Sequence, residues 1–228
     1  MSILVENYQN ILKEVTSAAA AAGRKTDDVK LLVVSKTKPV WMLKELYDAG
    51  VREFGENREP ELAEKVQSMP GDVIWHFIGP VQSNKIRKVI KNAQVVHSIS
   101  SLSQIEKFDR IAGEEKLHPE ILLEVNISGE ESKGGLTPQE LPAAAAAAAK
   151  CVNIKFRGLM TMAPFQAESA ELKQIFSTLT TLRDQCEKTC DIPLPVLSMG
   201  MSGDFPEAIS CGATIVRVGS KIFAGVEK

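Results

Sequence analysis

The 228-residue sequence is poor in the residues that build metal sites, disulfide frameworks and membrane spans. Its four cysteines and three histidines show no C-x-x-C pair and no zinc-type spacing, so we expect neither a disulfide nor a bound metal. The longest apolar run is the alanine tract 143–149, which is too short to cross a bilayer. The first residues lack a basic segment followed by an apolar core, so we expect no signal peptide.

An excess of charge of one sign is also absent, since the formal net charge is −2 and the sequence pI is about 6.0. This balance provides no large basic surface for nucleic acid or for an anionic membrane. With 44% hydrophobic and 25% charged residues, the chain is typical of one globular domain, residues 1–228. We therefore expect a soluble cytoplasmic protein whose partner is a small molecule.

Strand-like and helix-like segments alternate along the chain. Apolar runs predict strands at residues 30–35, 51–55, 73–78, 95–99, 121–127, 155–161, 196–199 and 214–218. Helical patterns lie between them at residues 39–49, 60–68, 83–91, 100–113, 138–150, 167–190 and 204–211. One more helix, at residues 3–22, precedes the first strand and is expected to lie across the barrel. Strict alternation implies parallel pairing, so this order predicts an α/β fold with a single (β/α)8 TIM barrel.

An open doubly wound sheet is the alternative fold. It agrees less well with the sequence, because no G-x-G-x-x-G or Walker A sequence occurs. The alanine tract has maximal helix propensity and little side-chain chemistry, so we expect a helix there and assign it no function.

Lys36 follows the first predicted strand, just after the apolar run Leu31–Val34. Chemistry in TIM barrels lies at the C-terminal ends of the strands, and an amine there can attack a carbonyl carbon and form an imine. The alternative is a lysine that extends from a strand end into water and has no chemical role. The other residues at the barrel mouth distinguish this alternative from an imine-forming lysine.

Glycine and serine follow the seventh and eighth strands, where such barrels often bind phosphate. Gly200-Met201-Ser202-Gly203 leads into a predicted helix, and Gly219-Ser220 follows the last strand. Glycine lets backbone N–H groups approach an anion closely, and serine adds a hydroxyl donor. Either loop alone is as consistent with an ordinary turn, and the two together favour a phosphate site.

Arg217 lies within the apolar strand Ile215–Gly219, where a buried cation requires a partner. The partner could be a strand-end carboxylate such as Glu124, or an unprotonated ring nitrogen of a bound cofactor. The residue alone does not distinguish the two.

Several fragments together resemble the pyridoxal phosphate homeostasis proteins, single-barrel relatives of the N-terminal domain of alanine racemase and of ornithine decarboxylase (fold type III). The resemblance covers nearly the whole chain and is carried by six fragments: Val33–Pro39 (VVSKTKP), Phe54–Asn57 (FGEN), Trp75–Lys85 (WHFIGPVQSNK), Arg157–Met160 (RGLM), Leu197–Ser202 (LSMGMS) and Arg217–Gly219 (RVG). Val81 and Gly203 depart from the leucine and aspartate that relatives often carry, and neither change removes an expected ligand.

The resemblance implies a bound pyridoxal 5'-phosphate (PLP). Lys36 would carry it as a Schiff base, Arg217 would face its pyridine nitrogen, and Asn57 would lie beside its ring substituents. The remaining implied contacts are His76 and Ile78 near the ring, Ser202, Gly219 and Ser220 on the phosphate, and Met199 and Met201 along the phosphate loop.

A carrier of PLP is expected rather than an enzyme with strong turnover. A racemase needs acid–base groups on both faces of the cofactor, commonly a lysine and a tyrosine from a second domain. The two tyrosines, Tyr8 and Tyr47, lie in predicted helices away from the mouth. We therefore expect a monomer that hands PLP to apo-enzymes or responds to a regulatory protein. A weakly active amino-acid racemase and a cofactor-free class I aldolase that uses Lys36 are the alternatives.

Overall fold

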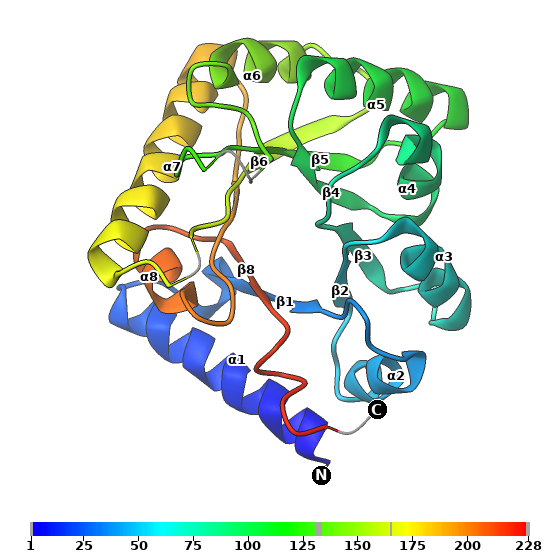
Figure 1. Cartoon of the computed structure of the whole chain (residues 1–228), viewed down its shortest axis with the longest axis vertical. Coiled ribbons are helices and arrows are strands. Elements are labelled where there is room, and N and C mark those ends of the chain that lie inside the picture. The colour runs from blue at the N-terminus through cyan, green and yellow to red at the C-terminus, as the bar shows by residue number, and fades with distance from the viewer. Residues whose placement is uncertain (1, 131–133, 165, 227–228) are drawn as a thin grey trace.

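Eight parallel strands form a closed barrel in which each strand pairs with its neighbours in sequence and β8 pairs with β1 (Figure 1). The structure is a computed structural model that describes residues 2–130, 134–164 and 166–226. The strands are β1 (Lys30–Val34), β2 (Glu53–Glu56), β3 (Ile74–Phe77), β4 (Val95–Ile99), β5 (Glu120–Glu124), β6 (Lys155–Met160), β7 (Val196–Ser198) and β8 (Ile215–Val218). The predicted barrel is therefore confirmed, and the open sheet is excluded.

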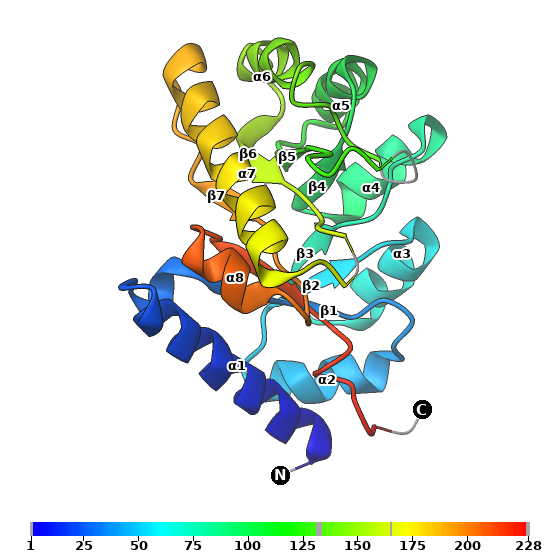
Figure 2. The same ribbon diagram turned by 60° about the vertical axis from the view of Figure 1, so that its left-hand side comes forward.

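Helices surround the barrel on the outside (Figures 1 and 2). They are α1 (Ile3–Ala21), α2 (Val40–Asp48), α3 (Glu59–Ser68), α4 (Ile86–Asn92), α5 (Leu102–Glu115), α6 (Leu141–Ala149), α7 (Ser169–Cys190) and α8 (Phe205–Ser210). Two 3-10 turns, η1 (Thr26–Asp28) and η2 (Ser83–Lys85), precede β1 and α4. Each predicted helix is present with shifted ends, and η2 takes the first turn of the helix predicted at residues 83–91.

Helix α1 occupies a place in the outer ring, which differs from the expectation that it lies across the barrel. It packs against α8 and α2, and so fills the position that a helix after β8 would take (Figure 2). Its buried residues Leu4, Ile11, Val15 and Ala19 form one helical stripe, and the Ser2 hydroxyl accepts a hydrogen bond from the Val5 N–H at its start. The N-terminal end of the barrel is consequently not covered by this helix.

The strands separate two interiors. Side chains such as Val33, Phe54 and Trp75 join the apolar core between the strands and the helices. Residues at alternate positions face the barrel axis, where Leu32 and Leu122 lie with buried polar groups such as Arg217. The barrel axis is thus more polar than the branched aliphatic filling usual for this fold.

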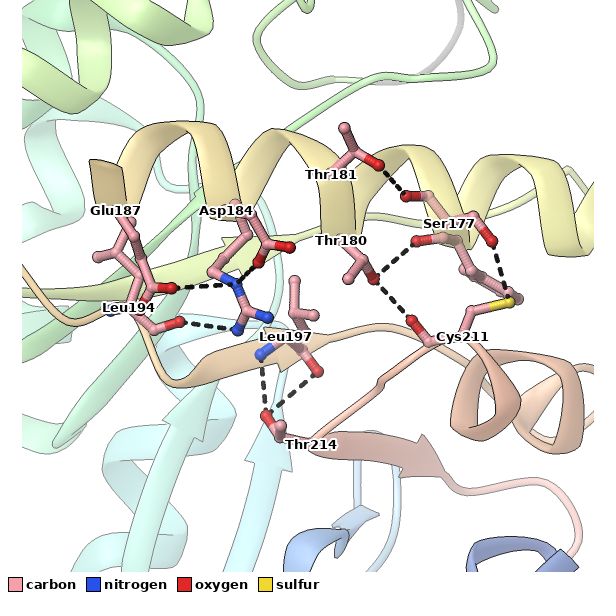
Figure 3. A network of polar contacts seen from close by, with 11 residues as sticks. Ser177, Thr180, Thr181, Asp184, Glu187, Leu194, Leu197, Cys211 and Thr214 are labelled. Carbon is pink, nitrogen blue, oxygen red and sulfur yellow. Dashed lines mark hydrogen bonds and ion pairs between the residues drawn. The ribbon is translucent and has the colours of Figure 1, made fainter. Parts of the chain in front are cut away.

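Helix α7 holds the last two strands in place (Figure 3). Thr180 Oγ1 donates to the Cys211 carbonyl oxygen at 2.6 Å, and Arg183 Nη1 donates to the Leu194 carbonyl oxygen at 3.1 Å. Thr214 Oγ1 accepts from the Leu197 backbone N–H at 2.8 Å and links β7 to the entry of β8. These bonds fix the strands whose ends carry the predicted phosphate loops.

The alanine tract is helical, as predicted; α6 packs against α5 and α7, and its Ala144, Ala145 and Ala148 are buried. All four cysteines are free thiols. Within the described part of the chain, no three potential metal ligands gather, and every helix is too short or too polar to cross a bilayer.

Candidate cofactor site

Lys36 lies two residues beyond β1, at the C-terminal mouth of the barrel. Ser35 before it is fully buried, whereas the Lys36 side chain is exposed. A tight turn follows, in which the Lys38 N–H donates to the Ser35 carbonyl oxygen and Thr37 takes a left-handed conformation with φ of 63°. The lysine amine is therefore accessible to a carbonyl compound that enters the mouth.

A buried polar cluster supports the backbone just before Lys36. Glu56 Oε1 accepts from Ser35 Oγ at 2.6 Å and from Lys65 Nζ at 2.7 Å, and Lys65 Nζ also donates to the Ser35 carbonyl oxygen. Burial raises the pKa of Glu56, and the hydrogen bonds from Lys65 and Ser35 oppose that rise. Sequence reasoning missed this cluster, although Lys65 follows buried Leu62 by three positions on the inward stripe of α3.

Asn57 offers an unused acceptor at the end of β2. Its Oδ1 is buried and has no hydrogen-bond partner among the described residues. The loop after β3 approaches it closely, because a Cβ on Gly79 would lie only 2.2 Å from the Asn57 carbonyl oxygen. Ile78, half-buried beside Gly55, lies next to Gly79. A donor from a bound molecule would satisfy this amide.

The loops after β7 and β8 both expose unpaired hydroxyls. Among the residues that the structure describes, neither Ser202 Oγ nor Ser220 Oγ makes a hydrogen bond, and neither side chain is buried. The Arg217 N–H donates to the Gly200 carbonyl oxygen at 2.9 Å and ties the first loop to β8. Gly219 allows the second loop to pass β1, since a Cβ there would lie 2.8 Å from the Val34 carbonyl oxygen.

The two methionines expected along the phosphate loop differ in position. Met199 is fully buried in the core between the strands and the helices. Met201 is half-buried within the loop, and its N–H donates to Asp204 Oδ1. The cofactor contacts of both residues stay predictions, and Met201 is the one that lies in the loop.

Arg217 is buried at the barrel axis with two hydrogen bonds. Its Nη1 donates to Ser198 Oγ at 2.7 Å, and its Nη2 donates to the Thr161 carbonyl oxygen at 2.9 Å. Burial lowers its pKa to about 10, whereas Asp204 and Glu124 act to raise it. Within the described chain no ion pair joins Arg217 to Glu124. The predicted alternative, in which Glu124 is the partner of Arg217, is therefore limited to a charge interaction at longer range.

His76 is the predicted site residue that reaches toward the N-terminal end of the barrel, and its ring bonds to His97 and Glu53. Its Nδ1 is 2.9 Å from His97 Nε2, and its Nε2 is 3.0 Å from Glu53 Oε2. His97 Nδ1 continues to Ser198 Oγ at 2.9 Å, and Ser198 leads to Arg217. The structure therefore joins His76 to Arg217 through a chain, and direct contact of His76 with the cofactor stays a prediction.

One assignment of protons gives each link of this axial chain a donor and an acceptor. Arginine can only donate, so Ser198 Oγ accepts from Arg217 and its own hydroxyl donates to His97 Nδ1. His97 Nε2–H then donates to His76 Nδ1, and His76 Nε2–H donates to Glu53. Burial, followed by the nearby His76 and Arg217, lowers the pKa of His97 well below its usual range, which agrees with a single proton on that ring.

The mouth thus presents an accessible amine, a buried guanidinium, and an amide oxygen and serine hydroxyls that have no partner among the described residues. Together these groups suit a carbonyl compound that carries a phosphate. These features define a barrel of the alanine racemase N-terminal domain class, and the sequence model of that family matches residues 7–226. Within this class, the chain belongs to the pyridoxal phosphate homeostasis protein family.

Relatives and solved structures support this placement. The chain is 41% identical over 226 residues to the pyridoxal phosphate homeostasis protein of Pseudomonas aeruginosa, covering 98% of this chain and 96% of that protein. PipY of Synechococcus elongatus, solved with PLP bound, is 34% identical with a TM-score of 0.82 over 92% of this chain and 100% of that one. A protein of unknown function from Bifidobacterium adolescentis reaches a TM-score of 0.92 at 33% identity, covering 97% of this chain and 94% of that one.

Proposed function

We propose that this protein binds PLP at the C-terminal mouth of its barrel and serves PLP homeostasis in the cytoplasm. It would act indirectly on amino-acid and keto-acid pools by holding the cofactor and passing it to PLP-dependent apo-enzymes or responding to a regulatory protein. The observation that carries the proposal is the set of polar groups at the mouth with Lys36 that have no hydrogen-bond partner in the described part of the chain. The family includes PipY, which was solved with PLP bound.

Each residue at the mouth has a distinct part in this proposal. Bound PLP supplies an aldehyde for imine formation with an amine. Lys36 Nζ provides that amine, while Ser202, Ser220 and the backbone at Gly219 hold the phosphate. Asn57 Oδ1, which lacks a partner in the described chain, accepts a hydrogen bond from the ring substituents. His76, Ile78, Met199 and Met201 complete the predicted surroundings.

Storage and transfer fit the geometry better than turnover. Arg217 can only donate hydrogen bonds, so beside the pyridine nitrogen it would favour the unprotonated form and would leave the ring a weak electron sink. Tyr8 lies in α1, and the Tyr47 hydroxyl donates to Asp72 Oδ1, so neither phenol is placed as an acid–base partner for Lys36. A single domain that acts as a monomer is proposed, and light scattering of the purified protein measures that state.

The absorbance spectrum of the purified protein tests the proposal. With PLP we expect a band near roughly 420 nm that borohydride removes and that Lys36→Ala lacks. Lys44→Ala is the matched control, because Lys44 is exposed on α2 and lies outside the proposed site. A spectrum unchanged by added PLP, or a band retained in Lys36→Ala, would contradict PLP binding at Lys36.

Hydrogen exchange distinguishes the carrier from the racemase. A carrier exchanges the α-hydrogen of added amino acids for deuterium no faster than free PLP does, whereas a racemase exchanges it rapidly and loses this activity in Lys36→Ala. Borohydride trapping of a carbonyl substrate by colourless protein would instead indicate a class I aldolase.

A further inference from the structure

A cavity of about 690 Å³ opens at the N-terminal end of the barrel, opposite the end that carries Lys36. The first residue of every strand lines it, so the cavity lies on the barrel axis. These residues are Lys30, Glu53, Ile74, Val95, Glu120, Lys155, Val196 and Ile215. Of the residues predicted to hold PLP, His76 alone lines this cavity, so PLP at the mouth does not account for it.

Among the described residues, no helix covers this end of the barrel and charged side chains replace much of its usual filling. Barrels of this type usually fill their axis with layers of bulky branched side chains. Here Lys30, Glu53, Glu120 and Lys155 begin four of the strands with charged groups. Helix α1 lies in the outer ring, and none of its residues lines the cavity.

Positive charge without a hydrogen-bonded partner gathers on the β6 side of the cavity. Arg157 Nε is buried, has no hydrogen-bond partner in the described chain, and lies 3.6 Å from Glu120 Oε1. Lys155 forms no ion pair with any residue that the structure describes. The Arg157–Glu120 ion pair is thus a long one, whereas Lys30 Nζ is 2.8 Å from Glu53 and Lys91 Nζ is 2.9 Å from Glu115. Asp27 and Asp28 line the cavity from the turn that precedes β1.

Arg157 lies at a β-bulge in β6, in the lining of the cavity. Phe156 pairs with Ile121 and Gly158 pairs with Leu122, so Arg157 is an extra residue between consecutive pairs. Only glycine fits after it, because a Cβ on Gly158 would lie 1.8 Å from the Val196 carbonyl oxygen. Lys155 and Arg157 both line the cavity, whereas Phe156 between them packs on the opposite face in the apolar core.

We propose that this cavity is a second binding site, specific for an organic carboxylate with an apolar body. The carboxylate binds the Nε edge of the Arg157 guanidinium, which matches its planar geometry, and Lys155 adds a second positive charge at the rim. The apolar body packs on Val95, Leu122 and Ile215, which line the floor. The volume is typical of sites for small organic molecules.

A matched pair of probes tests the site: 1-naphthylacetate and its neutral amide, 1-naphthylacetamide. Binding is measured by calorimetry on PLP-loaded protein, so that the cofactor occupies the phosphate loops. We expect the acid to bind at least about tenfold more tightly than the amide, as for loss of a charged hydrogen-bond partner. In protein labelled with ¹⁵N-arginine, the Arg157 Nε signal, assigned with Arg157→Gln, shifts with the acid.

Variants locate the binding. Arg157→Gln should lower the affinity for the acid at least about tenfold and leave the affinity for the amide unchanged. Arg110→Gln is the control, because Arg110 is exposed on α5 and pairs with Glu114. If Arg157→Gln fails to fold, as judged by near-UV circular dichroism, Lys155→Gln at the exposed rim replaces it, with a loss of about threefold or more. Equal binding of acid and amide, no binding of the acid, or an affinity unchanged in these cavity variants would overturn the proposal.

Discussion

Replacement of Ser198 by alanine tests the hydrogen-bonded chain at the barrel axis. Ser198 is fully buried, and its Oγ accepts from Arg217 Nη1 at 2.7 Å and lies 2.9 Å from His97 Nδ1. Alanine changes the volume little but leaves one N–H of a buried guanidinium without an acceptor. With a pKa of about 10, Arg217 stays charged near pH 7 and cannot avoid this penalty by losing its proton.

The expected cost is about 2 to 3 kcal/mol of unfolding free energy, typical of a buried charged donor that loses its acceptor. For a domain of this size, each kcal/mol lowers Tm by about 2 to 4 °C, so Ser198→Ala should melt about 4 to 12 °C lower. Urea unfolding of PLP-free protein avoids the stabilisation that a ligand adds. Ser210→Ala is the control and should cost less than about 0.5 kcal/mol, because its hydroxyl is exposed and bonds to the Glu207 carbonyl oxygen and to Cys211 Sγ at the surface.

A double-mutant cycle separates this effect from a general loss of packing. In an Arg217→Met background no guanidinium is left without a partner, so Ser198→Ala should cost at least about 1 kcal/mol less than in the native chain. The same cost in both backgrounds would show that Ser198 does not act through Arg217.

Two further predictions concern the ends of the barrel. Gly219→Ala would put a Cβ 2.8 Å from the Val34 carbonyl oxygen, beside the segment that leads to Lys36. The affinity for PLP, measured by absorbance titration, should therefore fall about tenfold. An unchanged Kd would show that the loop adjusts freely. The hydrogen bond from His76 lowers the pKa of Glu53 from 4.5 to about 2, so the stability that Glu53 contributes is present above pH 4.5 and is lost as the pH falls toward 2. Glu53→Gln should therefore show a shallower loss of stability over that range, and a parallel acid-unfolding curve would contradict this role.

The barrel and the ends of its strands were predictable because both depend on local patterns. Parallel strands place their C-terminal ends at one mouth, so Lys36, Asn57, Ser202 and Ser220 could be assigned to it once the strand runs were recognised. The place of α1 was not predictable in this way. The apolar stripe of α1 shows that one face of the helix is buried. The helices against which it packs, α8 and α2, are set by the open position in the outer ring of helices after β8.

Partners across the barrel could not be read from the sequence. The ring of His97 bonds to Ser198, 101 residues away, and no local pattern reports such a distance. Alternation in the strand Val95–Ile99 does place His97 inward with Val95, and that signal could have marked it as an axial residue. The bulge at Arg157 depends on the register between β5 and β6, which the sequence of either strand leaves open.

The axial chain also has an electrical consequence. In the proton assignment given above, every donated proton points from Arg217 toward Glu53, so both imidazoles have one orientation of their dipoles. The chain joins two groups of opposite charge, the Arg217 guanidinium at one end and the Glu53 carboxylate at the other, where Lys30 Nζ pairs with Glu53 at 2.8 Å. Because Lys30 compensates the Glu53 carboxylate, the buried guanidinium adds a long-range attraction for an anion to the hydrogen bonds of the serine loops at the mouth.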